Sequence, residues 1–538
     1  MAAALRCVQG LLGKIPTLRL LRRVATVSSH TSLTLVTVPT DILHVILQLL
    51  YDTWPSEEER RRYDHEICKG QYILALSETC RYMRAQTLPW IFRDVYNWSR
   101  PGIWPETLWR FFMSVHIRDY SVQHRAHIPL RPELYSALSG MRSLTRVTVR
   151  LEASVPAELL RALSLAPCLI FLEIHQARFD GSALSSPLPF ATLESLVVCI
   201  SGFRGVVRSD AIDHRREVAN VVALLKNLSQ SLTTLQISGD LLSPDFLSLT
   251  WAQLRTFVIT EHTPTPYITV PKLVSKMPAL HDLSILFSAD LSRDRDAGEM
   301  YPPFKLGNPG GGLLTHCSPL LTTITLSNLE PADPIFAQLP HSLESLHLLA
   351  MRDGYIPGHT RPARLWDAPL TLSTVPVALE SISHLQALAA LSLTLDDFAT
   401  ADTIHRIASV FLRLRFLQVG HATYSHGAEF RFDVRDESIL HALQRFSRLT
   451  HLRISLDFFE RAIDAQDGPQ GRAAQWLLEG LPGLCTVAFS WGGAWYDYGF
   501  ENIIWRVWDR SVFLLPRELP AFEPEPAEEV VYGVAIPP

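Results

Sequence analysis

The chain has 538 residues, of which 47% are hydrophobic and 19% are charged, a balance that supplies a large apolar core and excludes wholesale disorder. The net charge of -5 and the pI near 6.5 give no basic excess, so we expect no nucleic-acid partner. The seven cysteines are scattered and never spaced as CxxC, which predicts reduced thiols and excludes a structural zinc site.

Residues 1–36 form a basic stretch with no acidic residue before Asp41. We predict a disordered extension, with a mitochondrial transit peptide as the alternative. Because no run of eighteen or more apolar residues exists, we expect no membrane span. The expected location is cytoplasmic, nuclear or both.

Residues 38–50, VPTDILHVILQLL, predict the first helix. Pro39 suits the first helical position, and Asp41 in the first turn favours the helix dipole. From Ile42 to Leu50 only His44 and Gln48 are polar. The apolar surface is therefore wider than one stripe, and both faces of this helix must be buried.

A second helical pattern, YILALSETCRYMRAQ, begins at Tyr72, and we expect Pro89 to interrupt it. The segment LPWIFRDV then supplies a short third element. Three such pieces in under sixty residues bury too little surface of their own to be comfortably stable, so further burial must come from elsewhere.

These three segments resemble the F-box motif, especially in its fungal form, over residues 37–95. The resemblance implies binding of a Skp-type adaptor, which joins the chain to a cullin-based ubiquitin ligase. Residues 51–71 make a longer link than the family usually has, which leaves the register of the second helix open. The alternative is a helical cap on the domain that follows. The implied adaptor contacts are Pro39, Ile42, Leu43, Ile46, Leu47, Leu74, Leu76, Cys80 and Trp90.

A six-residue phrase with apolar residues at positions one, four and six recurs after residue 140, for example LTTLQI at Leu232. Its ending alternates with period two, which predicts a short strand with one buried face. Helical patterns such as REVANVVALLKNLSQ and TIHRIASVFLRL precede most copies. The twelve copies begin at Leu144, Leu169, Leu193, Leu232, Leu254, Leu280, Leu321, Leu343, Leu388, Leu414, Leu449 and Leu484.

One strand and one helix per unit resembles the leucine-rich-repeat family. The resemblance implies an α/β fold in which a small all-helical F-box-like module precedes a solenoid, with parallel strands on the concave face and helices outside. Uneven spacings and a mostly missing asparagine after the phrase predict an irregular bend. An ordinary α/β domain with leucine-rich strands is the alternative. The expected boundaries are 96–140 for a linker or N-terminal cap, 141–510 for the solenoid and 511–538 for a Pro/Glu-rich disordered tail.

Positions three, five and seven of each phrase should point out from the concave sheet. They are mostly Ser, Thr and small apolar residues, so recognition of a protein target should rely on shape and neutral hydrogen bonds. The candidate target-binding residues are Phe171, His175, Phe416 and His451.

No local pattern predicts catalysis, a cofactor or a metal. The glycine-rich GNPGGGLL lacks the GK[ST] of a phosphate-binding loop, and His124 with His127 lacks the glutamate of HExxH, so both are interpreted as loops. The Trp-rich end, residues 491–510, is expected to cap the solenoid, with an interface as the alternative.

The sequence therefore predicts a substrate-recruiting adaptor of a Skp-cullin-F-box ubiquitin ligase that performs no chemistry itself. Two other function classes remain open: a repeat scaffold with no ligase role, and a hydrolase whose site is assembled only in space.

Overall fold

The structure is a computed structural model, and it divides the chain into two compact units, broadly before and after residue 174. It describes residues 40, 43–44, 47–48, 77, 81–95, 106–118, 120–121, 126–127, 130, 132–151, 154–175, 177–179, 181–182, 184, 188–199, 214–261, 269–287, 306–307, 314–349, 370–395, 397–421, 437–456, 469–497, 500–513 and 528–529.

The first unit alternates helices with parallel strands. Strand β2 pairs in parallel with β1 on one side and with β5 on the other. A short antiparallel hairpin, β3 with β4, follows β2 and contains His127 of the HxxH pair; His124 lies outside the described residues. The elements are α6 (Arg81–Ile91), β1 (Asp94–Val95), α7 (Glu106–Trp109), β2 (Ser114–Arg118), β3 (Tyr120–Ser121), β4 (Ala126–His127), α8 (Pro132–Gly140), β5 (Arg146–Arg150), α9 (Ala157–Ser164) and β6 (Phe171–His175).

The strand stack begins before the first leucine phrase. In the segment FMSVHI, residues Phe112, Val115 and Ile117 stand at positions one, four and six, and all three are completely buried. Phe92 stands three positions before Val95 of β1, as Phe112 stands three positions before Val115. The two phenylalanine ring centres are 6.3 Å apart. The segment that was predicted to be a third F-box element therefore leads into the first strand of the stack.

The prediction that Pro89 interrupts the second helix is wrong, because α6 contains this residue. The helix continues through Pro89 to Ile91, so the proline stands in its last turn. A proline removes one backbone N–H donor from the helix. The free-energy cost is lower near the end of the helix, where few turns remain to be distorted. The backbone N–H of Phe92 still bonds to the carbonyl of Leu88 at 3.1 Å.

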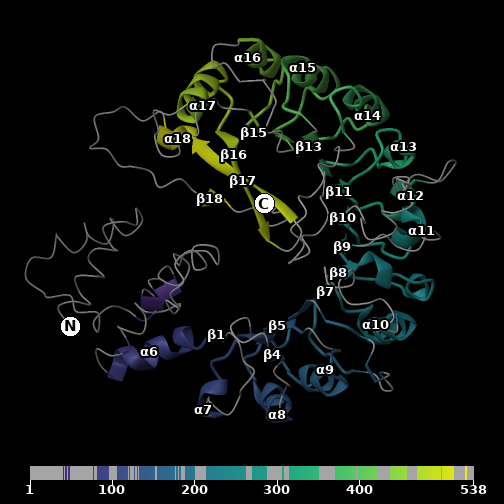
Figure 1. The fold of residues 1–538 in the computed structure, drawn as a ribbon, viewed down its shortest axis with the longest axis vertical. Helices are drawn as coiled ribbons and strands as arrows, with labels where there is room; N and C mark the ends of the chain where they lie inside the picture. The colour runs from purple at the N-terminus through teal and green to yellow at the C-terminus, as the bar shows by residue number, and fades with distance from the viewer. Residues whose placement is uncertain are drawn as a thin grey trace, which may run out of the picture. The chain divides into compact units, whose positions relative to one another are not determined.

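The second unit contains one long, curved sheet (Figure 1). Every neighbouring pair from β7 to β16 is parallel, and the strands follow one another in chain order. The phrases at Leu232, Leu254 and Leu280 form neighbouring strands, as predicted. The strands are β7 (Ser195–Cys199), β8 (Thr234–Ser238), β9 (Thr256–Glu261), β10 (Asp282–Phe287), β11 (Thr323–Ser327), β12 (Ser345–Leu349), β13 (Ala390–Leu395), β14 (Phe416–His421), β15 (His451–Ile454) and β16 (Thr486–Asp497).

Helices cover the outer side of this sheet in Figure 1. They vary from fifteen residues in α10 to four in α12 and α13, which confirms an irregular solenoid. Between β8 and β9 two short 3₁₀ turns replace an α-helix. The outer elements are α10 (His214–Leu228), η4 (Gly239–Leu241), η5 (Phe246–Ser248), α11 (Val270–Val274), α12 (Leu314–Cys317), α13 (Ile335–Gln338), α14 (Val375–Ser381), α15 (Ala401–Val410), α16 (Glu437–Leu443) and α17 (Pro469–Gly480).

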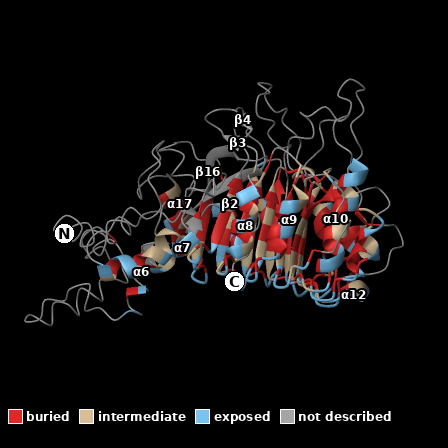
Figure 2. Cartoon of the chain, turned by 90° about the horizontal axis from the view of Figure 1, so that it is seen from below, coloured by how far each residue is buried: buried red, intermediate tan, exposed pale blue. Residues whose placement is uncertain are grey.

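The core lies between the sheet and the outer elements. Positions one, four and six of the phrases are buried throughout, and Leu232, Leu235 and Ile237 have no exposed surface. Where the 3₁₀ turns replace a helix, aromatic side chains fill the space, and the rings of Phe246 and Trp251 lie 5.2 Å apart. Buried residues dominate the strands and inner helix faces in Figure 2. The leucine pattern therefore confirms a leucine-rich-repeat type of solenoid.

Asn328 follows the phrase at Leu321 and ties three strands together. Its side-chain amide donates to the carbonyl of Phe287 at 2.8 Å, and its backbone N–H donates to the carbonyl of Leu349 at 3.0 Å. Its φ of 52° lies in the left-handed region, which asparagine tolerates better than most residues. Asn328 therefore fixes the turn that leaves β11 against both neighbouring strands.

The glycine-rich segment is anchored by a buried carboxylate. Asp333 accepts hydrogen bonds from the backbone N–H groups of Leu306 and Gly307, each at 2.9 Å, and of Ile335 at 2.8 Å. A Cβ on Gly307 would lie 2.1 Å from the backbone nitrogen of Ile335, so only glycine fits there. Gly307 is thus required by close packing, while residues 308–313 lie outside the described residues.

The last parallel strand continues into an antiparallel hairpin. Strand β16 pairs in antiparallel fashion with β17 (Phe500–Asp509), with a register shift between Trp491 and Trp495, and this hairpin follows the last parallel pair. In α18 (Arg510–Phe513), the Arg510 guanidinium donates to the carbonyl oxygens of Leu481, at 2.8 Å, and of Leu478, and so caps the end of α17. In the tail, β18 (Glu528–Glu529) pairs with β17.

Candidate protein-interaction surface

The inner face is defined here by the side chains at positions three and five of the phrases on β7–β16. The strand register aligns them in rows, because Thr323, Ser345 and Ala390 pair across β11, β12 and β13, as do Thr325, His347 and Ser392 two residues later. The predicted direction of these positions is consistent with that alignment, since positions four and six between them are buried in the core.

The centre of the inner face is less open than the sequence suggests. Thr325 has no exposed surface, Ser392 is 2% exposed and Thr323 is 8% exposed. Side chains on the inside of a curved sheet crowd together, and short hydroxyl side chains lie below the level of longer neighbours such as His347. Thr323 and Thr325, which were predicted to face a partner, are therefore largely covered within the chain, as is Ser392 on β13.

His347 is the main polar group of this centre. Its ring Nδ1 lies 2.7 Å from the Ser392 hydroxyl. Burial lowers the pKa of His347 to about 4. The buried Nε2 atom and the Thr325 hydroxyl have no hydrogen-bond partner. The imidazole is therefore neutral at physiological pH, and this part of the face carries no charge.

Several inner-face side chains bond to each other across neighbouring strands. Thr256 donates to the Asp282 carboxylate at 3.3 Å, and the Gln236 amide lies 3.1 Å from the Cys199 thiol. In the first unit, Thr148 donates in the same way to the Glu173 carboxylate at 3.0 Å. Such contacts hold the side chains in fixed positions, so that little rotamer entropy is lost when a partner binds.

The two predicted aromatic anchors each stand beside an arginine. The Arg453 guanidinium lies 5.6 Å from the Phe416 ring centre, and the Arg146 guanidinium lies 4.4 Å from that of Phe171. Both phenylalanines are half-buried. Arginine and large aromatic residues are the side chains that dominate many protein interfaces. These pairs were missed in the sequence because their members are 25 or more positions apart.

The two predicted histidines differ in exposure. His451 is exposed beside Phe416 in the register, and its Nδ1 lies 2.8 Å from the Thr450 hydroxyl. His175 ends β6 and is half-buried. The candidate target-binding residues thus lie on two separate stretches of strand rather than in one cluster.

In the F-box-like segment, three described side chains of the first helical stretch contact three side chains of the second stretch in the same chain order. Thr40 lies 3.5 Å from Tyr82, His44 lies 3.2 Å from Gln86, and Gln48 accepts from Arg93 at 3.1 Å. The partners are four residues apart along the first segment, and four and then seven residues apart along the second, so the two segments run in the same direction. A same-direction pair needs a connection long enough to return, which accounts for the long link at residues 51–71.

The predicted adaptor contacts divide into three groups. Leu43 and Leu47 have no exposed surface, so they pack within the chain. Trp90 is half-buried, with its ring 6.3 Å from that of His44. The others lie outside the described residues, namely Pro39, Ile42, Ile46, Leu74, Leu76 and Cys80.

Among the described residues, no helix is long and apolar enough to cross a membrane, and no group of three or more His, Cys, Asp or Glu side chains could hold a metal ion. In the same part of the chain Cys168, Cys199, Cys317 and Cys485 are free thiols.

No protein-family model matches the sequence, and no curated protein matches it. Three solved structures are similar in arrangement. They are a TLR13–ssRNA13 complex (13% identity, 68% of this chain and 50% of that one), the Toll–Spatzle complex in Drosophila (15%, 74% and 51%) and the yeast Rad7–Elc1 complex (13%, 80% and 91%), each with a TM-score of 0.33. The chain spans about half the length of the first two.

Proposed function

We propose that this chain is a substrate-recruiting subunit of a Skp-cullin-F-box type ubiquitin ligase. The N-terminal helical segment binds a Skp-type adaptor, and the repeats bind a protein target. The observation that carries the target-binding half is the long ordered inner face, with its neutral centre and with Arg453 beside Phe416. The Arg146–Phe171 pair on β5 and β6 supplies a second candidate anchor in the first unit. The adaptor-binding half rests on the sequence resemblance and on the two-faced first helix.

The burial of Leu43 and Leu47 refines the adaptor-binding surface. These two residues occupy one face of the first helical stretch and are already covered. Ile42 and Ile46 stand on another face by helical spacing, and they are the apolar residues that an adaptor would cover.

The chain contributes no catalytic group in this proposal. It holds the ligase at one end and the target in the repeats, so that ubiquitin transfer becomes nearly intramolecular. The gain is one of effective concentration, and it depends on simultaneous binding at both ends.

The second candidate function is a repeat scaffold with no ligase role. The complete burial of Leu43 and Leu47 favours it, because a helical cap would bury these residues in the same way. The two candidates differ in whether Ile42 and Ile46 bind an adaptor.

Calorimetric titration of the full chain with a recombinant Skp-type adaptor distinguishes them. Wild type should bind, and Ile42→Asp with Ile46→Asp should abolish micromolar binding, because burying unpaired charges costs several kcal/mol. Arg81→Ala, an exposed change on α6, is the matched control. No binding by wild type, or unchanged binding by the folded double variant, would leave the scaffold as the function.

A further inference from the structure

The two turns that lead into β14 and β15 carry a concentrated positive charge. We call this surface the arginine edge, and it consists of Arg413 and Arg415 on the first turn with Arg445 and Arg448 on the second. All four are exposed. Leu412, beside them, is 49% exposed, which makes it one of the few large apolar side chains on the surface.

Backbone hydrogen bonds fix the two turns against each other. Ser447 donates its hydroxyl to the carbonyl of Leu412 at 3.1 Å. The backbone N–H groups of Thr450 and His451 both donate to the carbonyl of Arg415, at 2.9 and 3.0 Å. The arginines therefore project from a rigid backbone, which lowers the entropic cost of binding.

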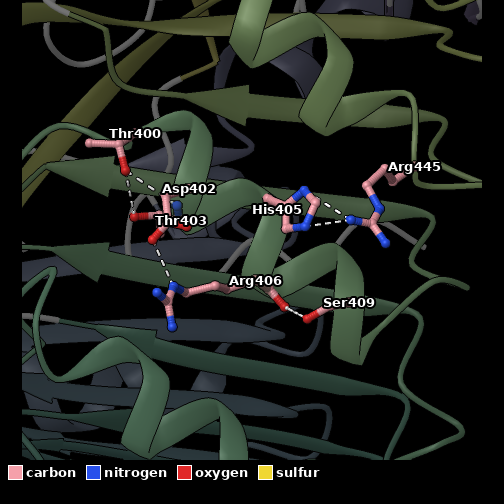
Figure 3. Close-up of polar contacts among 7 residues, drawn as sticks. All are labelled: Thr400, Asp402, Thr403, His405, Arg406, Ser409 and Arg445. Atoms are coloured by element: carbon pink, nitrogen blue, oxygen red, sulfur yellow. Dashed lines mark hydrogen bonds and ion pairs between the residues drawn. The ribbon is translucent and has the colours of Figure 1, made fainter.

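No described carboxylate neutralises the positive charges of the arginine edge. Within the described residues, none of its four arginines forms an ion pair with a carboxylate. Arg445 contacts only the ring of His405, at 2.9 Å from Nδ1, whereas the nearby Arg406 pairs with Asp402 at 2.7 Å (Figure 3). Like charges on neighbouring turns repel each other, so an anion bound among them gains from all four.

The residue type and the width of the edge limit the class of partner. Arginine binds carboxylate and phosphate groups through paired hydrogen bonds, with better geometry than lysine. The neighbouring turns, residues 382–389 and 481–485, contain no Lys or Arg. The two turns of the edge thus lie one strand spacing apart, roughly 5 Å. This width fits one or two anionic groups of a peptide, while a nucleic-acid strand needs a longer basic track.

We infer that the arginine edge binds a short acidic peptide segment of a protein partner, with phosphoserine or phosphothreonine as its strongest anionic group. Leu412 provides the contact for an apolar side chain next to that group. A phosphate carries nearly two negative charges and three acceptor oxygens, which suits a cluster of guanidinium groups. None of these residues belongs to the inner face or to the adaptor-binding helix, so the inference holds whether or not the chain belongs to a ligase.

Fluorescence anisotropy with the purified full chain tests this inference without any adaptor present. The probe is a labelled synthetic peptide with two phosphoserines next to a leucine, compared with the same peptide bearing serine or glutamate. We expect binding in the order phosphoserine, glutamate, serine, and a loss of affinity with added salt. Arg415→Ala and Arg448→Ala should each weaken phosphopeptide binding about tenfold.

Arg406→Ala is the matched control, since it removes an exposed arginine whose charge is already paired on the neighbouring α15. It should leave peptide affinity within about twofold, because surface ion pairs contribute little. Thermal melts followed by circular dichroism confirm that each variant is folded. Equal binding of the three peptides, no effect of Arg415→Ala and Arg448→Ala, or tighter binding of a labelled single-stranded oligonucleotide would overturn the inference.

Discussion

His347 should make the repeat array lose stability as the pH falls through the mildly acidic range. Its pKa is lowered by burial from 6.5 to about 4. Between these two values the unfolded chain binds more protons at this site than the folded chain does. Unfolding is therefore favoured as the pH falls below 6.5, and the effect is complete near pH 4. The shift corresponds to at most about 3 kcal/mol of unfolding free energy.

The assay is urea unfolding followed by circular dichroism, at several pH values from 7 to 4, for wild type and for His347→Gln. Carboxylates also titrate in this range, so the difference between the two proteins isolates the histidine. We expect wild type to lose up to about 3 kcal/mol more than the variant on acidification. Equal losses in the two proteins, or an imidazole that titrates near pH 6.5 by NMR, would refute the desolvated centre of the inner face.

Three further outcomes follow from particular contacts. Asp333→Ala should lower the unfolding free energy by about 3 kcal/mol, because it leaves buried backbone N–H groups without an acceptor. Urea unfolding measures this change, and a loss below about 1 kcal/mol would contradict the prediction. Arg510→Ala should expose the end of α17 to faster hydrogen exchange while distant strands stay protected, and uniform protection would contradict the cap. Phe171→Ala with Phe416→Ala should weaken target capture at least tenfold in a pulldown while adaptor binding is retained, and full capture would place recognition elsewhere.

The repeat pattern was predictable because its signal is local. Each phrase places three apolar residues within six positions, and burial of that face requires a strand. All twelve phrases form strands, and those from β7 to β16 pair in parallel and in chain order. Phe92 and Phe112 were missed because phenylalanine stands where the other phrases have leucine. In the core of a repeat, size and hydrophobicity matter more than the particular residue.

The interaction surfaces were harder to predict because they join distant residues. Arg453 lies 37 positions after Phe416, and its approach depends on the lengths of the intervening insertions. The arginine edge has the same origin, since two ordinary turns become neighbours only through strand stacking. The burial of Thr325 and Ser392 at the centre of the inner face was not predicted, because the sequence does not reveal how the curvature of the sheet covers these side chains.

We propose that one chain combines two independent binding functions, one for a Skp-type adaptor and one for a protein target. The most direct measurement is affinity purification of the full chain from cells with quantitative mass spectrometry, comparing wild type with two double variants. A Skp-type adaptor and a cullin should be lost with Ile42→Asp and Ile46→Asp, while target proteins should be lost with Phe171→Ala and Phe416→Ala. The absence of adaptor from the wild-type sample, or the loss of both kinds of partner in both variants, would contradict this account.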